Sequence, residues 1–309
     1  MSNDAAVAEL LASISSHKQA LEGSAHVEID GNRIIGSGTV PGFEMESDVS
    51  ENGIILRVRV KAGVKMEKPV HLCFGMLPEE GIQKIDMQVD VEEEAEVSFM
   101  AHCTFPNAVD VKHLMDARLN VGPRASYSYF ERHVHAEEGG IYVKPKALIT
   151  LDEGARFKTE FELLKGRVGE IDIDYSATAK ADSMMDMLTR IFARGDDKVK
   201  IREAAELNGE RAVAVLVSHL AVRDDAYADI YSDLAANAPY CRGHVDCKEI
   251  VQGNGRARAI PIVAVNNPLA HITHEAAIGS VDSKQLQTLM ARGLDEEAAT
   301  DLIIQGLLS

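Results

Sequence analysis

A short phrase recurs in this chain of 309 residues. In it, an aliphatic residue is followed by three polar or turn residues, an alanine, one variable residue and an apolar residue. The phrase occurs as "VEEEAEV" at 91, "VGPRASY" at 121 and "LDEGARF" at 151, a spacing of 30 residues, and again as "VRDDAYA" at 222. A fixed period of this size indicates units that stack on one another, because one unit cannot bury its own apolar face. The repeat favours a parallel β-helix or similar solenoid over the alternative, a β-sandwich with regular hairpins.

Most of the chain between its two ends has the pattern of strands and turns. Segments such as "IILRVRVKAGV" and "EIDIDYSATAKA" alternate apolar and polar residues, and Gly, Asp, Glu and Asn separate them. We therefore expect a mainly β protein whose β-helix core spans residues 24–268. Residues 181–195, "ADSMMDMLTRIFARG", fit either an inserted helix or a Met-rich strand, and periodicity does not separate these two interpretations.

Helices are predicted at both ends of the chain. Apolar residues recur at helical spacing near the start, which predicts an amphipathic helix within residues 1–23. Near the other end the sequence predicts two helices, the first capped by Ser283 and the second opened by Asp295. They would form a helical hairpin in a C-terminal segment that spans residues 269–309.

Composition argues against several classes of partner. The chain has 32 Lys and Arg against 49 Asp and Glu, and its formal net charge of -17 would repel a nucleic-acid backbone. No apolar run approaches the length of a membrane span, and the N-terminus does not resemble a signal peptide. Four cysteines in a chain of this size indicate reduced thiols rather than a disulfide framework. We therefore expect a cytoplasmic protein with neither nucleic acid nor membrane as partner.

The run "YCRGHVDC" places Cys241, His244 and Cys247 in a pattern that suggests metal binding. A structural zinc site needs four ligands that converge on one point. In an extended strand the two cysteines share one face and His244 points to the other, because the side-chain period is two. Only a helix or a tight turn would bring all three side chains together. A zinc-stabilised structural solenoid, with His271 or His274 as the fourth ligand, is the alternative interpretation if such a turn forms.

A second polar cluster, "LAHITHEAAIGS", places His274 beside Glu275. Its simplest interpretation is a surface turn, but imidazole and carboxylate groups also bind iron and zinc together with a thiolate such as Cys247. A β-helix hydrolase or lyase that uses carboxylates on a solenoid face is a further alternative. Few aromatic residues are available for a sugar-binding cleft, which argues against it. The carboxylates in question are Asp224, Asp225 and Asp229.

Four other residues have less specific patterns. His133 and His135 are two residues apart among acidic neighbours, and we interpret them as a solvated strand end. Cys73 and Cys103 lie in apolar segments and are interpreted as small core residues. The sequence contains no phosphate-binding glycine loop, so we expect no nucleotide site.

The last 70 residues resemble the C-terminal part of the SufB/SufD family, the scaffold subunits of the SUF iron–sulfur cluster assembly machinery. The resemblance covers an arginine and cysteine that lead into a strand, a proline-centred strand, an Asn-Pro step, a His-Glu-Ala signature and helices with Gln-Leu and Arg-Gly. These occur as "CRGHVDCKEIVQG" and "ARAIPIVAVNNPLAHITHEAAIGSVDSKQLQTLMARGLDEEAATDLIIQGLL". The family implies a right-handed parallel β-helix flanked by helical segments, in agreement with the repeat.

The resemblance also implies a function. Such a chain is a scaffold rather than an enzyme, and it forms a homodimer or pairs with a SufB/SufD paralogue. Its complex includes SufC, an ABC-type ATPase that supplies the ATPase activity. The scaffold takes sulfur from a sulfur donor, holds a transient iron–sulfur cluster made from iron and sulfide, and passes it to apo acceptor proteins.

Residue roles follow from the same resemblance. Cys247 falls where SufB-like chains carry their essential cysteine, which implies a sulfur acceptor and metal ligand, and His274 and Glu275 fall on the His-Glu signature as further metal ligands. Cys241 has no counterpart in the family. The C-terminal helices match the segment that docks the ATPase, although burial within the hairpin is the alternative for each apolar residue there. The docking candidates are Met290, Leu294, Leu302 and Ile303.

Overall fold

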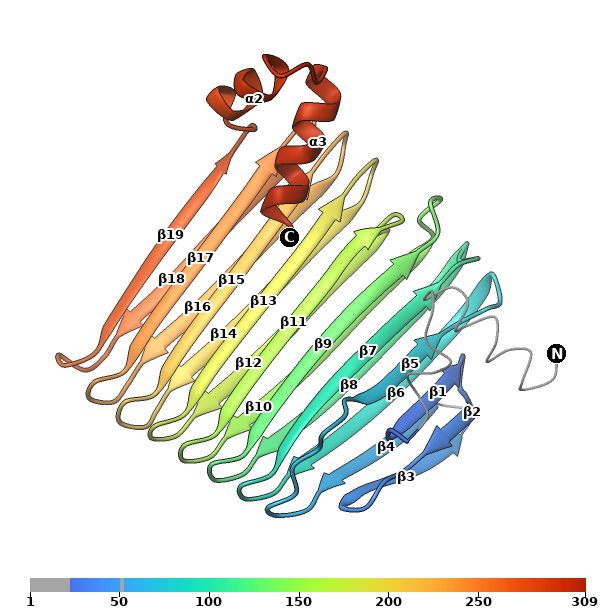
Figure 1. The fold of residues 1–309 in the computed structure, drawn as a ribbon, viewed down its shortest axis with the longest axis vertical. Coiled ribbons are helices and arrows are strands. Elements are labelled where there is room, and N and C mark those ends of the chain that lie inside the picture. Colours follow the sequence, from blue (N-terminus) through green and yellow to red (C-terminus); the bar gives the residue numbers. More distant parts are fainter. Residues whose placement is uncertain (1–22, 51–52) are drawn as a thin grey trace.

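The computed structural model describes residues 23–50 and 53–309 as two long sheets that stack into a solenoid (Figure 1). From residue 53 onward, strands that follow one another along the chain alternate between the sheets, and neighbours within a sheet are parallel. The predicted parallel β-solenoid is therefore confirmed, and the β-sandwich alternative is wrong. The N-terminal helix predicted within residues 1–23 lies outside the described residues.

Nineteen strands make up the described part of these sheets. The first sheet contains β1 (His26–Asp30), β2 (Arg33–Gly38), β5 (Val70–Gly75), β7 (Glu96–Phe105), β9 (Ser126–His135), β11 (Arg156–Lys165), β13 (Met184–Ala193), β15 (Val213–Val222), β17 (Arg242–Val251) and β19 (His271–Gly279). The second contains β3 (Phe43–Ser50), β4 (Gly53–Val60), β6 (Glu80–Val91), β8 (Asp110–Val121), β10 (Ile141–Leu151), β12 (Glu170–Ala179), β14 (Lys198–Leu207), β16 (Tyr227–Ala236) and β18 (Arg256–Val265). The Met-rich segment that the sequence left undecided is strand β13.

The core is a narrow lumen between the two sheets. Alternate side chains of each central strand point into it, because the side-chain period of a strand is two. Parallel register then places residues one repeat apart side by side, as with Val97, Tyr127 and Phe157. The rings of Tyr127 and Phe157 stack with centroids 5.5 Å apart. Each coil therefore buries its apolar face on the next, as the repeat predicts.

The repeated phrase corresponds to the turns between the sheets. Ala95, Ala125 and Ala155 are fully buried where even-numbered strands lead into odd-numbered ones, and the residue before each alanine has a positive φ. The copy at 222 instead joins odd-numbered β15 to even-numbered β16, so this turn lies at the opposite rim of the solenoid, where strands of the first sheet lead into the second. There the positive φ falls on Asp224. Two turn types, one for each rim, therefore explain why this copy departs from the 30-residue spacing.

The solenoid extends beyond the predicted boundary at residue 268. Strand β19 pairs in parallel with β17 and adds one more strand to the first sheet, so residues predicted as part of a helical segment are β structure up to Gly279. Two helices follow, α2 (Ser283–Met290) and α3 (Glu296–Leu307). Asp282 rather than Ser283 caps α2, whereas Asp295 caps α3 as predicted. No helix within the described ranges is long and apolar enough to span a membrane.

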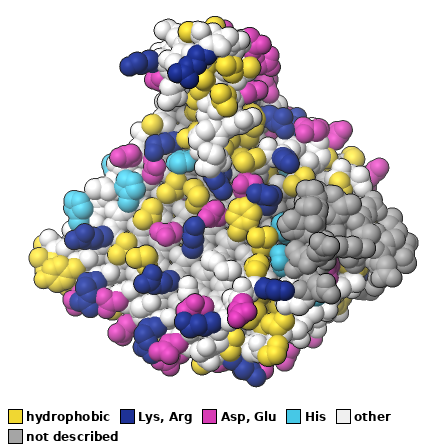
Figure 2. Space-filling view, viewed as in Figure 1, with side chains coloured by type: hydrophobic (Ala, Val, Ile, Leu, Met, Phe, Trp, Pro, Cys, Tyr) yellow, Lys and Arg dark blue, Asp and Glu magenta, His cyan; other side chains and the backbone are white. Residues whose placement is uncertain are grey.

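Helix α3 packs on the outer surface of the first sheet, near one end of the solenoid (Figure 1). Ile304 and Leu308 are buried there against Ala221 of β15, with part-buried Phe192 and Ile250 beside them. The Arg223 guanidinium pairs with the Asp301 carboxylate and lies over the Phe192 ring. Hydrophobic side chains are visible on this helical segment at the top of Figure 2.

The solenoid ends at β18 and β19 without a further coil in the described chain. These two strands are the last members of their sheets, so one edge of each has no strand partner. The register places Val263, Val265 and Ile278 on the lumen side, where 39%, 49% and 46% of these residues is exposed. An exposed apolar end with unpaired strand edges is typical of a surface that another chain covers.

Candidate functional site

The three residues of the Cys-x-x-His-x-x-Cys run are divided between the two faces of β17 and the turn before it. Cys241 and Cys247 are fully buried on the lumen side. His244 points outward, and its Nδ1 lies 2.8 Å from the hydroxyl of Thr273. The predicted division is confirmed, and these three side chains do not converge on one metal ion.

Cys247 lies in the second-last strand of its sheet. Ser218 of β15 and Ala276 of β19 flank it within the sheet, and across the lumen the Ser232 hydroxyl lies 3.8 Å from its Sγ. Burial raises the pKa of the Cys247 thiol, and the Ser218 and Ser232 hydroxyls offset part of that rise. The thiol is therefore protonated and unreactive in this conformation, and it needs exposure or a cation to become a nucleophile.

Two buried carboxyl groups lie near this thiol, and the sequence analysis singled out neither. Glu249 follows Cys247 by two residues on the same face, and neither of its carboxyl oxygens has a hydrogen-bond partner. Across the lumen, Glu203 of β14 accepts a 2.7 Å hydrogen bond from Thr189. Burial raises the pKa of each carboxyl group to about 7. Both groups can therefore change charge near neutral pH.

His274 and Glu275 lie on β19 rather than in a surface turn, so that interpretation is wrong. In the register, His274 pairs with Val245, which places it on the lumen side together with Cys247. Glu275 pairs with Asp246 and lies on the outer face, close enough to contribute to raising the pKa of Lys248. Both residues are exposed. One chain thus places His274 on the Cys247 side and Glu275 on the opposite side.

The apolar residues of the C-terminal helices differ in exposure. Met290 and Leu302 are 41% and 46% exposed, whereas Leu294 and Ile303 are partly buried. The residues that hold α3 on the sheet are Ile304 and Leu308, which the sequence analysis did not select. A groove of about 1090 Å³ lies between the helices and the ends of β17 and β19, and Leu302 and Ile303 line it.

A third group lies in the lumen, in the N-terminal half of the solenoid. His133 and His135 are 1% and 5% exposed, so their interpretation as a solvated strand end is wrong. Cys103 is buried as predicted, but it is not a purely apolar core residue, because its Sγ lies 3.4 Å from Glu131. The Glu131 carboxylate also bonds His133 Nε2 at 2.7 Å. Ligand atoms of Cys103, Glu131 and His133 lie within 4.8 Å of one another, the one such group of three within residues 23–50 and 53–309.

Fold and sites together define a class: a parallel β-solenoid with a buried thiol near an open end and a helical hairpin beside it. The family model for the SufBD core domain of the SUF iron–sulfur cluster assembly system matches residues 77–307. This chain belongs to the SufBD family of iron–sulfur cluster assembly proteins.

Three relatives illustrate the range of similarity. A SufBD family protein of Methanocaldococcus jannaschii is 42% identical over 277 residues, which cover 90% of this chain and 88% of that protein. One from Pyrococcus horikoshii is 37% identical over 284 residues, 92% of this chain and 86% of that protein. The SufB protein of Bacillus subtilis is 23% identical over 263 residues, 81% of this chain and 54% of that protein. The first two relatives match over nearly their whole length.

Proposed function

We propose that this chain is a scaffold, not itself an enzyme, on which iron–sulfur clusters are assembled at Cys247 and then released to acceptor proteins. The observation that carries the proposal is the place of Cys247, a buried thiol that, in the described part of the chain, a single strand, β19, separates from the open end of the solenoid. Family membership supports the class of function. Displacement of β19 would expose the thiol without disturbing the coils beneath it.

Cys247 is the proposed sulfur acceptor. Its thiolate attacks the outer sulfur of a donor persulfide, which gives a Cys247 persulfide and releases the donor thiolate. Iron and sulfide are cargo in this scheme, and a mixed set of thiolate, imidazole and carboxylate ligands would hold the cluster less tightly than four thiolates. Easy release is what a scaffold requires.

His274 and Glu275 are the proposed further ligands, and they suit a site shared between two chains. Glu275 faces away from Cys247 within one chain, so a second copy or a paralogue is needed to bring both to one cluster. The exposed apolar end formed by β18 and β19 supports pairing at this place. The dimer therefore completes the site.

The proposed ATPase partner is of the ABC type and docks on α2, α3 and the groove beside them. Leu302 is the best supported of the docking candidates, because it is exposed and lines the groove. The groove also reaches Glu249 and the end of β19. Movement of the helices by the ATPase would therefore act on the strand that covers Cys247.

Anaerobic reconstitution with iron and sulfide tests the assigned thiol. We expect cluster absorbance from the wild-type chain, a strong loss of it in Cys247→Ser, and its retention in Cys241→Ser. Cys241 is a matched control because it is equally buried, on the same side and six residues away. Equal reconstitution of Cys247→Ser and the wild type would show that the site is assigned wrongly. The zinc-stabilised structural solenoid of the sequence analysis predicts instead that Cys241→Ser and His244→Ala lose bound metal.

A further inference from the structure

The lumen group around Cys103 has the composition and placement of a metal site. Cys103 of β7 and His133 of β9 are direct register partners, so their side chains lie side by side on the lumen face. Glu131 precedes His133 by two residues and shares that face. The Cys103 Sγ to Glu131 distance is 3.4 Å and the His133 Nε2 to Glu131 distance is 2.7 Å. Donor atoms bound tetrahedrally to one zinc ion are separated by about 3.3–3.7 Å, so small shifts would suffice.

A second imidazole, a candidate fourth ligand, lies beside this group on the opposite sheet. His113 of β8 is 1% exposed, and its ring lies 6.1 Å from that of His133, centroid to centroid. The Gln83 amide donates both its N–H bonds to carbonyl oxygens, those of Gly31 and Gly75, so Gln83 Oε1 accepts from His113 Nδ1 at 2.7 Å. The bare lone pair of His113 is therefore on Nε2, which is buried and has no hydrogen-bond partner. An imidazole held through Nδ1–H to a carbonyl oxygen, with Nε2 free, is the usual form of a metal-ligating histidine.

The His133 ring is held in the same way. His135 Nδ1 donates to the carbonyl oxygen of Arg167 at 3.0 Å, which leaves His135 Nε2 as an acceptor. His133 Nδ1 lies 3.0 Å from that nitrogen and donates to it, so His133 Nε2 points at Glu131. One proton is then shared between His133 Nε2 and the Glu131 carboxylate. The surrounding bonds therefore fix the tautomers of both imidazoles, and they hold His133 against the Glu131 carboxylate.

We propose that Cys103, Glu131, His133 and His113 bind one divalent ion of the zinc and iron(II) class inside the solenoid. Thiolate, imidazole and carboxylate ligands together are typical of these two ions. Binding displaces two protons, one from the Cys103 thiol and the one shared by His133 and Glu131. The bound ion has two positive charges and the thiolate and carboxylate two negative ones, so the net charge of the buried site is unchanged. Burial of the ion therefore adds no uncompensated charge to the lumen.

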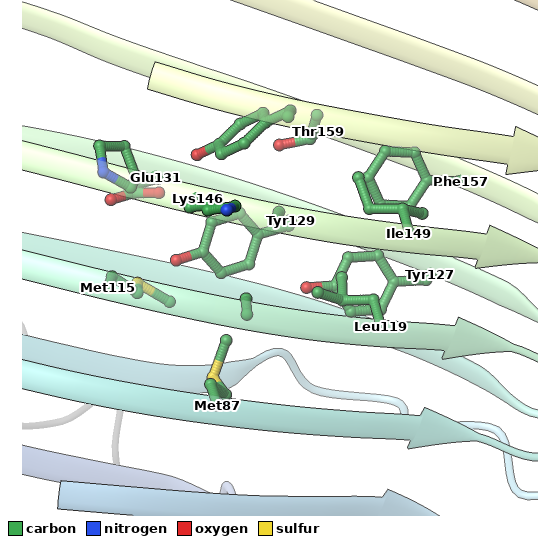
Figure 3. Close-up of a pocket in the computed structure, with 14 residues that line it drawn as sticks. Met87, Met115, Leu119, Tyr127, Tyr129, Glu131, Lys146, Ile149, Phe157 and Thr159 are labelled. Carbon is green, nitrogen blue, oxygen red and sulfur yellow. The ribbon is translucent and has the colours of Figure 1, made fainter. Parts of the chain in front are cut away.

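This site is separate from the proposed assembly site at Cys247. Strands β9 and β17 are four positions apart in one sheet, which corresponds to about 19 Å. A small cavity lies beside the proposed ion site and leaves space for exchange of the ion. Glu131 lines this lumen cavity of about 30 Å³ together with Tyr129, Met115 and Thr159 (Figure 3). The ion would link β7 and β9 of the first sheet to β8 of the second, and would thereby fix the two sheets to each other.

Anaerobic titration of the metal-free, full-length Cys247→Ser chain with Co²⁺ tests the proposal without the assembly site. We expect one equivalent to bind with thiolate-to-cobalt charge-transfer absorption and visible bands of tetrahedral intensity. Cys103→Ser in the same background should lose the charge-transfer band. Cys73→Ser should keep it, because Cys73 pairs with His102 and so lies on the opposite face of the sheet from Cys103.

A charge-transfer band that survives in Cys103→Ser, or a Cys247→Ser parent chain that binds no cobalt, would overturn the assignment. X-ray absorption of the zinc-loaded Cys247→Ser chain gives a second measurement that does not depend on folding of the Cys103 variant. One sulfur at about 2.3 Å with nitrogen or oxygen at about 2.0–2.1 Å is expected. Two sulfur ligands would show that another pair of cysteines binds the metal. Failure of cluster assembly at Cys247 would leave both measurements unaffected.

Discussion

A single buried carboxyl group in the lumen makes the stability of the fold depend on pH. Glu203 lies inside the solenoid with one carboxyl oxygen bonded to Thr189 and the other without a partner. Burial raises its pKa from 4.5 to about 7. Between these two values the folded chain keeps a proton that the unfolded chain has released, so the stability present below pH 4.5 is lost as the pH rises to about 7.

Replacing Glu203 by Gln should remove this loss, since the amide can still accept the Thr189 hydrogen bond and does not ionise. A pKa rise from 4.5 to about 7 corresponds to about 3 kcal/mol. We expect the free energy of unfolding of Glu203→Gln, relative to wild type, to increase by up to that amount between pH 4.5 and pH 8. Urea unfolding at both pH values measures it. The control is Glu206→Gln, an exposed position on the same strand, and an equal change there would contradict the explanation.

At the scale of elements, the C-terminal helix separates residues that hold the fold from residues that are free to bind. Ile304 is buried against the sheet, and Leu302 two residues earlier is exposed in the groove. Ile304→Ala should weaken the packing of α3 on the sheet by about 2–4 kcal/mol, because it removes buried methyl groups. Amide hydrogen exchange within α3 should therefore become faster.

Leu302→Ala is the matched change on the same helix. It should leave hydrogen exchange of α3 unchanged and weaken capture of the ABC-type ATPase. If Leu302→Ala speeds exchange as much as Ile304→Ala does, then Leu302 is a packing residue and the docking assignment fails. The pair of variants thus separates the two interpretations that the sequence left open for these helices.

The strands and turns of the solenoid could be predicted from the sequence in part. The 30-residue phrase predicted the stacked strands, because each copy is a turn that buries an alanine. The two-residue period of a strand predicted that His244 would lie on the opposite face from Cys241 and Cys247. The boundary at 268 was wrong because β19 has exposed residues on both faces, which gives it no strand-like pattern of polarity. The sequence does contain a signal for the lumen group, because Cys103 and His133 are one 30-residue repeat apart and stacking therefore makes them neighbours.

At the scale of the whole molecule, the solenoid is asymmetric. At the N-terminal end the sheets finish in antiparallel pairs, β1 with β2 and β3 with β4. At the other end they finish in β18 and β19 with exposed apolar residues on the lumen side. The two ends thus differ in strand pairing, since only the end at β18 and β19 finishes in parallel strands. An end-to-end dimer through the open ends would bury this surface and bring the sites of the two chains together.

A mixing experiment tests whether that dimer shares its ligands. In one chain Cys247 and Glu275 lie on opposite faces of the sheet, so the proposed cluster takes Cys247 from one chain and Glu275 from the other. Cys247→Ser and Glu275→Gln should each fail to reconstitute a cluster alone. Unfolded together and refolded as a mixture, half of the dimers would contain one chain of each kind, and each of these would have one intact site. We expect about a quarter of the wild-type cluster absorbance to return. If both ligands came from the same chain, no mixed dimer would contain an intact site and no absorbance would return.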